Sequence, residues 1–230
     1  MKIGILQTGY APDILLETGD YPQLFERLLA GQGFEFETFK VVDMEFPAAV
    51  TACDGWLITG SKHGVYEDHA FIPPLEDFIR DAFKAEVPVA GVCFGHQIMA
   101  QALGGQVEKF SEGWAIGATD YHFGDQTVRL NAWHQDQVIR PPEGAQTVGH
   151  SEFCRHAALS YGAKGYSVQP HPEFDADFIS GLITHRGRGV VPDELLARAS
   201  SRLDLPVDNA QIANQIAAFF KAARVAASSS

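Results

Sequence analysis

Residues 88–97 read Pro-Val-Ala-Gly-Val-Cys-Phe-Gly-His-Gln, an apolar run followed by a cysteine between two glycines. The run from Pro88 to Val92 lacks alternation of apolar and polar residues, which predicts a strand buried on both faces. A helical pattern follows from Gly95 to Leu103 and ends at Gly104-Gly105. The pattern G-x-C-x-G between a buried strand and a helix indicates a nucleophile elbow.

The chemistry of a nucleophile explains why glycines flank Cys93. A sharp turn from strand to helix strains the backbone, so Gly91 and Gly95 relieve close contacts and leave the cysteine exposed at the sheet edge. The helix N-terminus favours the thiolate, which is the reactive form. The N–H of Phe94 would then be placed to stabilise an oxyanion. The simpler alternative is a buried cysteine in a glycine-rich turn, and the flanking strand and helix favour the nucleophile.

Strands and helices alternate on both sides of this turn. Further strands are expected at 2–7, 35–41, 55–59, 157–159 and 165–169, and helices at 20–30, 73–86, 176–184, 193–200 and 208–223. Two β-like segments, 116–123 and 127–133, flank Gly124-Asp125 and predict a hairpin. The alternation indicates βαβ units. We therefore expect an α/β fold with a doubly wound, mostly parallel sheet, helices on both faces, a small antiparallel segment and C-terminal helices.

The length of 230 residues is enough for one large domain. We expect a single domain over 1–225, with a core at about 1–175, a helical extension at about 176–225, and a tail at 226–230. Phe219 and Phe220 lie on the apolar side of the last predicted helix. Apolar helix faces usually meet the protein's own core, so we expect this helix to pack on the sheet.

Charge and composition exclude several classes of partner. The chain has 17 Lys and Arg residues against 29 Asp and Glu residues, a net charge of −12, so no nucleic-acid partner is expected. No apolar run is long enough for a membrane span, and Ile3 to Leu6 is too short for a signal peptide. The three cysteines include no closely spaced pair, which argues against a disulfide framework and favours the cytoplasm.

A cysteine nucleophile needs an imidazole and a group that orients it. Two segments offer a histidine and a carboxylate two positions apart, His171-Pro172-Glu173 and His134-Gln135-Asp136. Spacing alone does not choose between them, although the prolines at 170 and 172 mildly favour the first. No pattern such as HExxH is present, so neither a metal nor a cofactor is expected. Ordinary surface or core positions are expected for His122, His150, His156 and His185.

Two motifs together carry a family resemblance. Gly-Val-Cys-Phe-Gly-His-Gln at 91–97 and Gln-Pro-His-Pro-Glu-Phe at 169–174 resemble the class I (triad-type) glutamine amidotransferases, especially the amidotransferase domain of GMP synthase and free-standing relatives such as γ-glutamyl peptidases. The similarity spans roughly residues 1–175 and implies a flavodoxin-like fold. It also implies Cys93 as nucleophile, His171 as base and Glu173 as the carboxylate that orients the base.

The resemblance extends to residues around the expected substrate. Ile-Thr-Gly-Ser at 58–61 is similar to the family's Gly-Gly-Pro loop, and Gly60 matches the glycine whose N–H is the second oxyanion donor. Thr59 and Ser61 depart from the flanking Gly and Pro. The resemblance further implies substrate contacts for Gln97 and for the segment Trp133, His134, Gln135 and Asp136, which otherwise reads as a polar strand end.

The activity implied is cleavage of the side-chain amide of glutamine or a γ-glutamyl compound through a thioester on Cys93. No G-x-x-x-x-G-K-[ST] phosphate loop is present, so ammonia would pass to a separate synthase subunit, or the protein would hydrolyse γ-glutamyl compounds itself. One alternative is a catalytically silent binding or regulatory subunit, which the intact cysteine, histidine and glutamate disfavour. Another is a thiol sensor or protease of a related fold, which the Pro-His-Pro-Glu segment disfavours.

Overall fold

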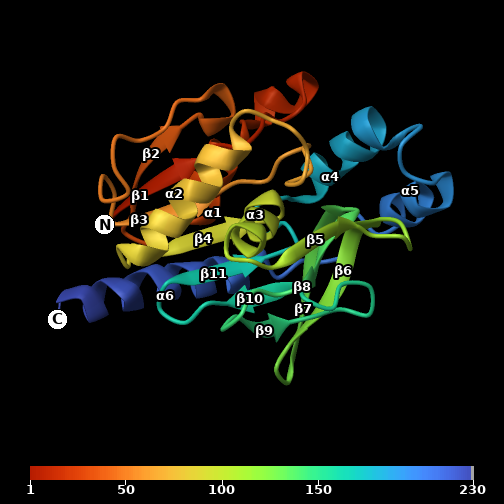
Figure 1. Ribbon diagram of the computed structural model, residues 1–230. Coiled ribbons are helices and arrows are strands. Elements are labelled where there is room, and N and C mark those ends of the chain that lie inside the picture. Colours follow the sequence, from red (N-terminus) through yellow and green to blue (C-terminus); the bar gives the residue numbers. More distant parts are fainter. Residues whose placement is uncertain (229–230) are drawn as a thin grey trace.

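The centre of the molecule is a seven-stranded sheet in the order β2-β1-β3-β4-β11-β10-β9. The structure is a computed structural model that describes residues 1–228 (Figure 1). The strands from β2 to β11 pair in parallel, whereas β10 and β9 add an antiparallel edge. This sheet confirms the expected α/β class. Its strands are β1 (Lys2–Leu6), β2 (Glu35–Phe39), β3 (Gly55–Ile58), β4 (Val89–Val92), β9 (Gln146–Gly149), β10 (Ala158–Ser160) and β11 (Gly165–Val168).

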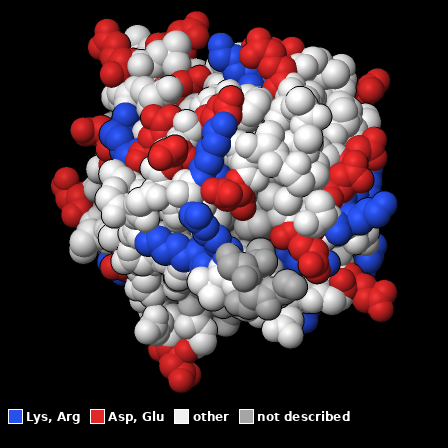
Figure 2. Space-filling view, turned by 90° about the vertical axis from the view of Figure 1, so that its left-hand side faces the viewer, with Lys and Arg blue, Asp and Glu red and all other residues white. Residues whose placement is uncertain are grey.

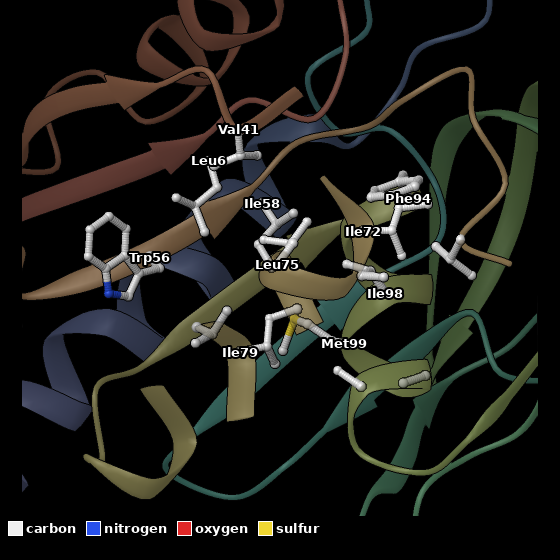
Figure 3. Close-up of a cluster of buried hydrophobic side chains, with 14 of the residues drawn as sticks. Leu6, Val41, Trp56, Ile58, Ile72, Leu75, Ile79, Phe94, Ile98 and Met99 are labelled. Carbon is white, nitrogen blue, oxygen red and sulfur yellow. The ribbon is translucent and has the colours of Figure 1, made fainter. Parts of the chain in front are cut away.

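Helices α2 (Ile72–Lys84) and α3 (Phe94–Ala102) cover one face of the sheet. They share a buried cluster with the strands, which Figure 3 shows around Trp56, Leu75 and Phe94. Apolar residues recur along α2 at helical spacing, so one side of the helix is apolar and faces the strands. This cluster holds α3, and therefore the turn that precedes it, firmly against the sheet.

Helices α1 (Tyr21–Leu28) and α6 (Asn209–Ser228) cover the opposite face. Asp20 caps the N-terminus of α1 in a capping box. Its carboxylate accepts a hydrogen bond from a backbone N–H of the helix, and the Asp20 N–H donates to the side chain of Gln23. Phe25 of α1 and Phe220 of α6 both pack in the cluster on this face, and both are fully buried. Both faces are covered, which explains why the central strands are apolar without alternation.

Two small antiparallel sheets lie beyond the central one. Strands β6 (Ala115–Phe123) and β7 (Gln126–His134) form the predicted hairpin, and β5 (Gln106–Lys109) pairs with β8 (Asp136–Arg140). The short strands β5, β8 and β9 are not among the predicted elements. Each consists mostly of polar residues, so no apolar run or alternation marks it in the sequence.

The chain after residue 175 is helical, as expected. It forms α4 (Ala176–Leu182), the π-helix η3 (Ile183–Gly187), α5 (Asp193–Ser200) and α6. Helix α6 runs through 228, so it contains part of the segment 226–230 that the sequence assigned to a tail, and 229–230 lie outside the described residues. Shorter 3-10 helices are η1 (Asp13–Thr18) and η2 (Val41–Asp43).

The face in Figure 2 shows acidic and basic side chains interspersed, without a broad basic surface on the part described. Elsewhere, Asp120 and Arg129 form an ion pair across the β6–β7 hairpin, with 2.7 Å between Arg129 Nε and Asp120 Oδ1. Among residues 1–228, no helix has both the length and the apolar character required to cross a bilayer.

Candidate active site

The candidate site lies where four neighbouring strands end. Thr8, Gly60, Cys93 and His171 follow β1, β3, β4 and β11, which are adjacent in the sheet. The carboxyl ends of parallel strands meet at one edge, and ligands of such sheets bind outside that edge. A pocket of about 370 Å³ opens there, and Cys93 and His171 both line it.

Cys93 occupies a strained turn between β4 and α3. Its φ of 53° and ψ of −103° are unusual for a residue with a side chain. The flanking glycines are required by contact. A Cβ atom on Gly95 would lie 2.3 Å from the carbonyl oxygen of Ile58, and one on Gly91 would lie 2.5 Å from the backbone of Gly95. The geometry has the features of a nucleophile elbow, in which the backbone is strained and the thiol faces the pocket.

His171 and Glu173 form a buried pair beside Cys93. Nδ1 of His171 lies 2.7 Å from Oε1 of Glu173, and the side chains are 5% and 0% exposed. Burial lowers the pKa of His171, but the Glu173 carboxylate and the Cys93 thiol group, which also hydrogen-bonds the ring, raise it by more, to about 10. The imidazole ring is therefore held between a carboxylate and a sulfur atom, and both favour its protonated form.

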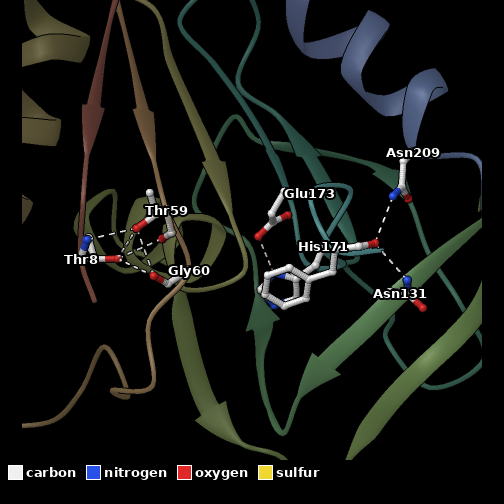
Figure 4. A network of polar contacts seen from close by, with 8 residues as sticks. Thr8, Thr59, Gly60, Asn131, His171, Glu173 and Asn209 are labelled. Carbon is white, nitrogen blue, oxygen red and sulfur yellow. Dashed lines mark hydrogen bonds and ion pairs between the residues drawn. The ribbon is translucent and has the colours of Figure 1, made fainter. Parts of the chain in front are cut away.

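The His171 ring is held in place by its neighbours. The ring of Phe174 stacks on it with centroids 4.0 Å apart and planes within 5°. The carbonyl oxygen of Phe174 accepts hydrogen bonds from the side-chain amides of Asn131 and Asn209, each at 3.0 Å (Figure 4). The N–H of His171 donates to the carbonyl of Asn131 at 2.8 Å. These positioning residues come from distant segments, and the sequence analysis did not find them.

The alternative pair, His134 and Asp136, is arranged differently. Nδ1 of His134 lies 3.2 Å from the carbonyl oxygen of Asp136, not from its carboxylate. That oxygen can only accept, so Nδ1 carries the proton and Nε2 is an acceptor with no partner among the described residues. Burial, and then the charge of His171, lower the pKa of His134 to about 3. Both residues line the pocket, so they belong to the site without forming a triad.

Gly60 lies against the reacting groups. A Cβ atom at Gly60 would lie 3.1 Å from Cε1 of His171 and 3.8 Å from Cβ of Cys93. The hydroxyls of Thr8 and Thr59 each lie 3.0 Å from the carbonyl oxygen of Gly60, which fixes this peptide (Figure 4). The turn at Gly60 is therefore fixed by hydrogen bonds although its neighbours depart from the Gly-Gly-Pro pattern. The hydroxyl of Thr59, one of these departures, makes one of the hydrogen bonds.

The other predicted residues fall around the same pocket. Phe94 is the first residue of α3, so its N–H has no acceptor within the helix. Gln97 lines the pocket, but its amide donates to the Asp136 carbonyl at 2.9 Å and to Gln169 at 3.1 Å. Trp133 and Gln135 line the pocket beside them.

Part of the pocket wall comes from segments to which the sequence analysis gave no function. Leu182 and Arg186 reach the pocket from α4 and the π-helix, and Lys109 and Trp114 reach it from the region before β6. A π-helix in this position indicates a functional site, since such turns often occur at functional sites. The residue types of this segment do not by themselves reveal the π-helix. The loop at 61–67, which includes Lys62, completes the rim of the pocket.

Comparison with known proteins agrees with this geometry. The family model described as glutamine amidotransferase class-I matches residues 20–177. The chain is 30% identical over 181 residues to gamma-glutamyl peptidase 4 of Arabidopsis thaliana, with 72% of each chain covered. It is 36% identical over 129 residues to a glutamine-hydrolyzing GMP synthase of Macrococcus caseolyticus, covering 52% of this chain and 24% of that protein.

The fold is also found among solved structures. A glutamine amidotransferase from Methylobacillus flagellatus superposes with a TM-score of 0.75 at 22% identity, and covers 98% of this chain and 93% of its own. A glutamine amidotransferase from Thermotoga maritima gives a TM-score of 0.72 at 18% identity, with 97% of each chain covered. The family match, the sequence relatives and the strand order together show that this chain belongs to the class-I glutamine amidotransferase family.

Proposed function

We propose that the protein hydrolyses the side-chain amide of glutamine or of a γ-glutamyl compound, with Cys93 as nucleophile, His171 as acid and base, and Glu173 as the group that orients His171. The observation that carries the proposal is the convergence of Cys93, His171 and Gly60 at one sheet edge, where Cys93 and His171 line one pocket. The named activities of the sequence relatives support the same chemistry.

In the first step, the Cys93 thiolate attacks the amide carbonyl carbon and the C–O double bond becomes an oxyanion. The N–H groups of Gly60 and Phe94 would hold this oxyanion. As the C–N bond breaks, His171 passes a proton from Nε2 to the departing nitrogen, and a γ-glutamyl thioester remains on Cys93. Since Nδ1 of His171 is engaged by Glu173, Nε2 is the nitrogen available for this transfer.

In the second step, His171, now neutral, takes a proton from water. The resulting nucleophile attacks the thioester, the C–S bond breaks, and glutamate is released with the Cys93 thiolate restored. The raised pKa of His171, about 10, supports a protonated ring as the donor in the first step.

The charges around the pocket support an amino-acid substrate. Lys109 and Arg186 could neutralise the α-carboxylate of a glutamyl group, and Asp136 could pair with its α-ammonium group. Trp114 and Trp133, with ring centroids 6.5 Å apart, supply an apolar wall for the glutamyl chain or its leaving group.

The test measures turnover of glutamine and of a panel of γ-glutamyl dipeptides, and the release of glutamate is the readout. The Cys93→Ala variant should lose the activity, and a chloroketone analogue of glutamine should add one covalent equivalent to Cys93 in the natural protein alone. Faster release from dipeptides than from glutamine would favour a self-contained hydrolase. Preference for glutamine would favour a synthase partner that takes up the ammonia. Absence of both turnover and labelling would support a silent binding subunit and contradict the proposal.

A further inference from the structure

The loop after β3 brings together three side chains of the kind that bind transition metals. His63, Glu67 and His69 each offer one ligand atom, and these atoms all lie within 4.8 Å of one another. Nε2 of His69 lies 2.8 Å from Oε2 of Glu67, and Nδ1 of His63 lies 3.7 Å from the same oxygen. Both imidazoles are therefore directed at one carboxylate oxygen.

The backbone of this loop is fixed, so the three side chains start from held positions. The N–H of Glu67 donates to the carbonyl of Gly64 at 3.1 Å, and the N–H of His69 donates to the carbonyl of Glu67 at 3.0 Å. The N–H of His63 donates to the Ser61 hydroxyl at 3.2 Å. A site whose ligands are already positioned loses little conformational entropy when an ion binds.

The histidine rings are also positioned by packing. Their centroids lie 3.9 Å apart with planes tilted by 56°, and the ring of His69 stacks near Phe71 at 5.9 Å and 23°. Their side chains are 20% and 33% exposed, so both are partly shielded from water while Glu67 remains accessible. An ordinary ion pair would need only His69 and Glu67. A second histidine aimed at the same oxygen is the arrangement that a shared cation would require.

We propose that His63, Glu67 and His69 bind a divalent transition-metal ion of the zinc type at the rim of the pocket. Two imidazoles and one carboxylate form a common ligand set for zinc, with ligand bonds of about 2.0–2.2 Å. Ligand atoms around one such ion lie about 3.3 Å apart if the geometry is tetrahedral, which the present separations can reach through small side-chain rotations. The spacing H-x3-E-x-H belongs to a loop, so a search for helical metal motifs overlooks it.

The site shares a wall with the candidate active site. His63 and Glu67 line the same pocket as Cys93, so the proposed ion would lie at the wall that the two sites share. The proposal concerns binding of the ion and does not depend on the reaction proposed for Cys93.

The experiment measures zinc bound per chain by equilibrium dialysis and elemental analysis. It uses the Cys93→Ala protein as background, because Cys93 and His171 could themselves bind zinc. This protein should bind one equivalent, and adding Glu67→Gln or His69→Gln should weaken binding at least about tenfold. His185→Gln, an exposed histidine outside the loop, serves as the matched control and should leave binding unchanged.

Cobalt provides a second readout that a folding defect would not imitate. Cobalt(II) added to the background protein should give the visible absorption of a low-coordinate site, and His63→Gln should reduce it, while circular dichroism shows both proteins folded. Absence of stoichiometric zinc binding would overturn the proposal. Binding that survives all three ligand substitutions would overturn it as well, because the ion would then lie elsewhere.

Discussion

The charge on His171 depends on two neighbours that act against its burial. Burial alone would favour the neutral imidazole, whereas the carboxylate of Glu173 and the sulfur of Cys93 favour the cation and raise the pKa to about 10. The raised pKa means that protonation of His171 stabilises the fold. This contribution is complete below the unfolded-state pKa of about 6.5 and is lost as the pH rises through about 10.

We expect the Cε1–H resonance of His171 to titrate near pH 10 in the natural protein. The midpoint should fall in Cys93→Ala and in Glu173→Gln, because each substitution removes one of the groups that favour the cation. Histidine proton–carbon spectra recorded from pH 5 to pH 11 measure this directly. His185→Gln identifies one exposed resonance and serves as the control. A midpoint at or below 6.5 in the natural protein, or one unmoved by both substitutions, would contradict this assignment of charges.

At the scale of elements, the junction between β1 and β3 holds the peptide of Gly60. The hydroxyls of Thr8 and Thr59 lie 3.1 Å apart, and both contact the Gly60 carbonyl oxygen. The Thr8 hydroxyl also lies 3.0 Å from the carbonyl oxygen of Thr59. Because a peptide is planar, this contact restricts the direction of the Gly60 N–H, which belongs to the same peptide. Thr8 is therefore a positioning residue for the turn that faces Cys93.

Thr8→Val replaces a hydroxyl with a methyl group of similar size and leaves the Gly60 carbonyl with Thr59 alone. We expect kcat to fall by about 10- to 100-fold, which is less than the 10²–10³-fold effect of removing an oxyanion donor outright. KM should change little, since the pocket keeps its lining. Steady-state kinetics of glutamyl hydrolysis measure both constants. Thr8→Ser keeps the hydroxyl and should retain most of the activity, and equal losses in the two variants would refute a role through the hydroxyl.

The sequence predicted the strands and helices that have strong residue patterns. It did not reveal the residues whose roles depend on contacts between distant segments. The strand before Cys93 and the helix after it follow from an apolar run and a glycine pair, and both are found. His171 and His134 had equal spacing to a carboxylate, and only the turn at 171–173 brings Nδ1 to a carboxylate oxygen. Asn131 and Asn209 could not be found, because their role depends on a backbone carbonyl of Phe174, which carries no side-chain signature.

At the scale of the whole molecule, the chain after residue 175 belongs to both the core and the pocket. Phe220 of α6 is fully buried, lies edge-on to Phe34 at 6.0 Å, and covers Gly55, where an added Cβ would lie 2.9 Å from its ring. Arg186 of the π-helix lines the pocket at the other end. We propose that residues 1–225 form one domain in which the C-terminal helices unfold together with the sheet.

Phe220→Ala tests this arrangement through the free energy of unfolding. Losing a fully buried phenylalanine should lower that free energy by about 3–5 kcal/mol. Phe219→Ala, at the neighbouring and only partly buried position, is the matched control and should cost less. Urea unfolding followed by fluorescence and by circular dichroism measures both variants. Separate transitions for the two signals, or an unchanged free energy of unfolding in Phe220→Ala, would show that α6 is not part of the same cooperative unit.

A stack of aromatic rings beside His171 has a consequence for the proton transfer proposed above. Phe174 lies flat on His171, and Phe178 lies flat on Phe174 with centroids 4.3 Å apart, so the imidazole is one end of a three-ring column. Stacking of this kind restricts rotation of the imidazole ring. In the reaction proposed above, the scissile nitrogen would therefore have to approach a stationary proton donor, and we expect molecules too bulky for that approach to occupy the cavity without being cleaved.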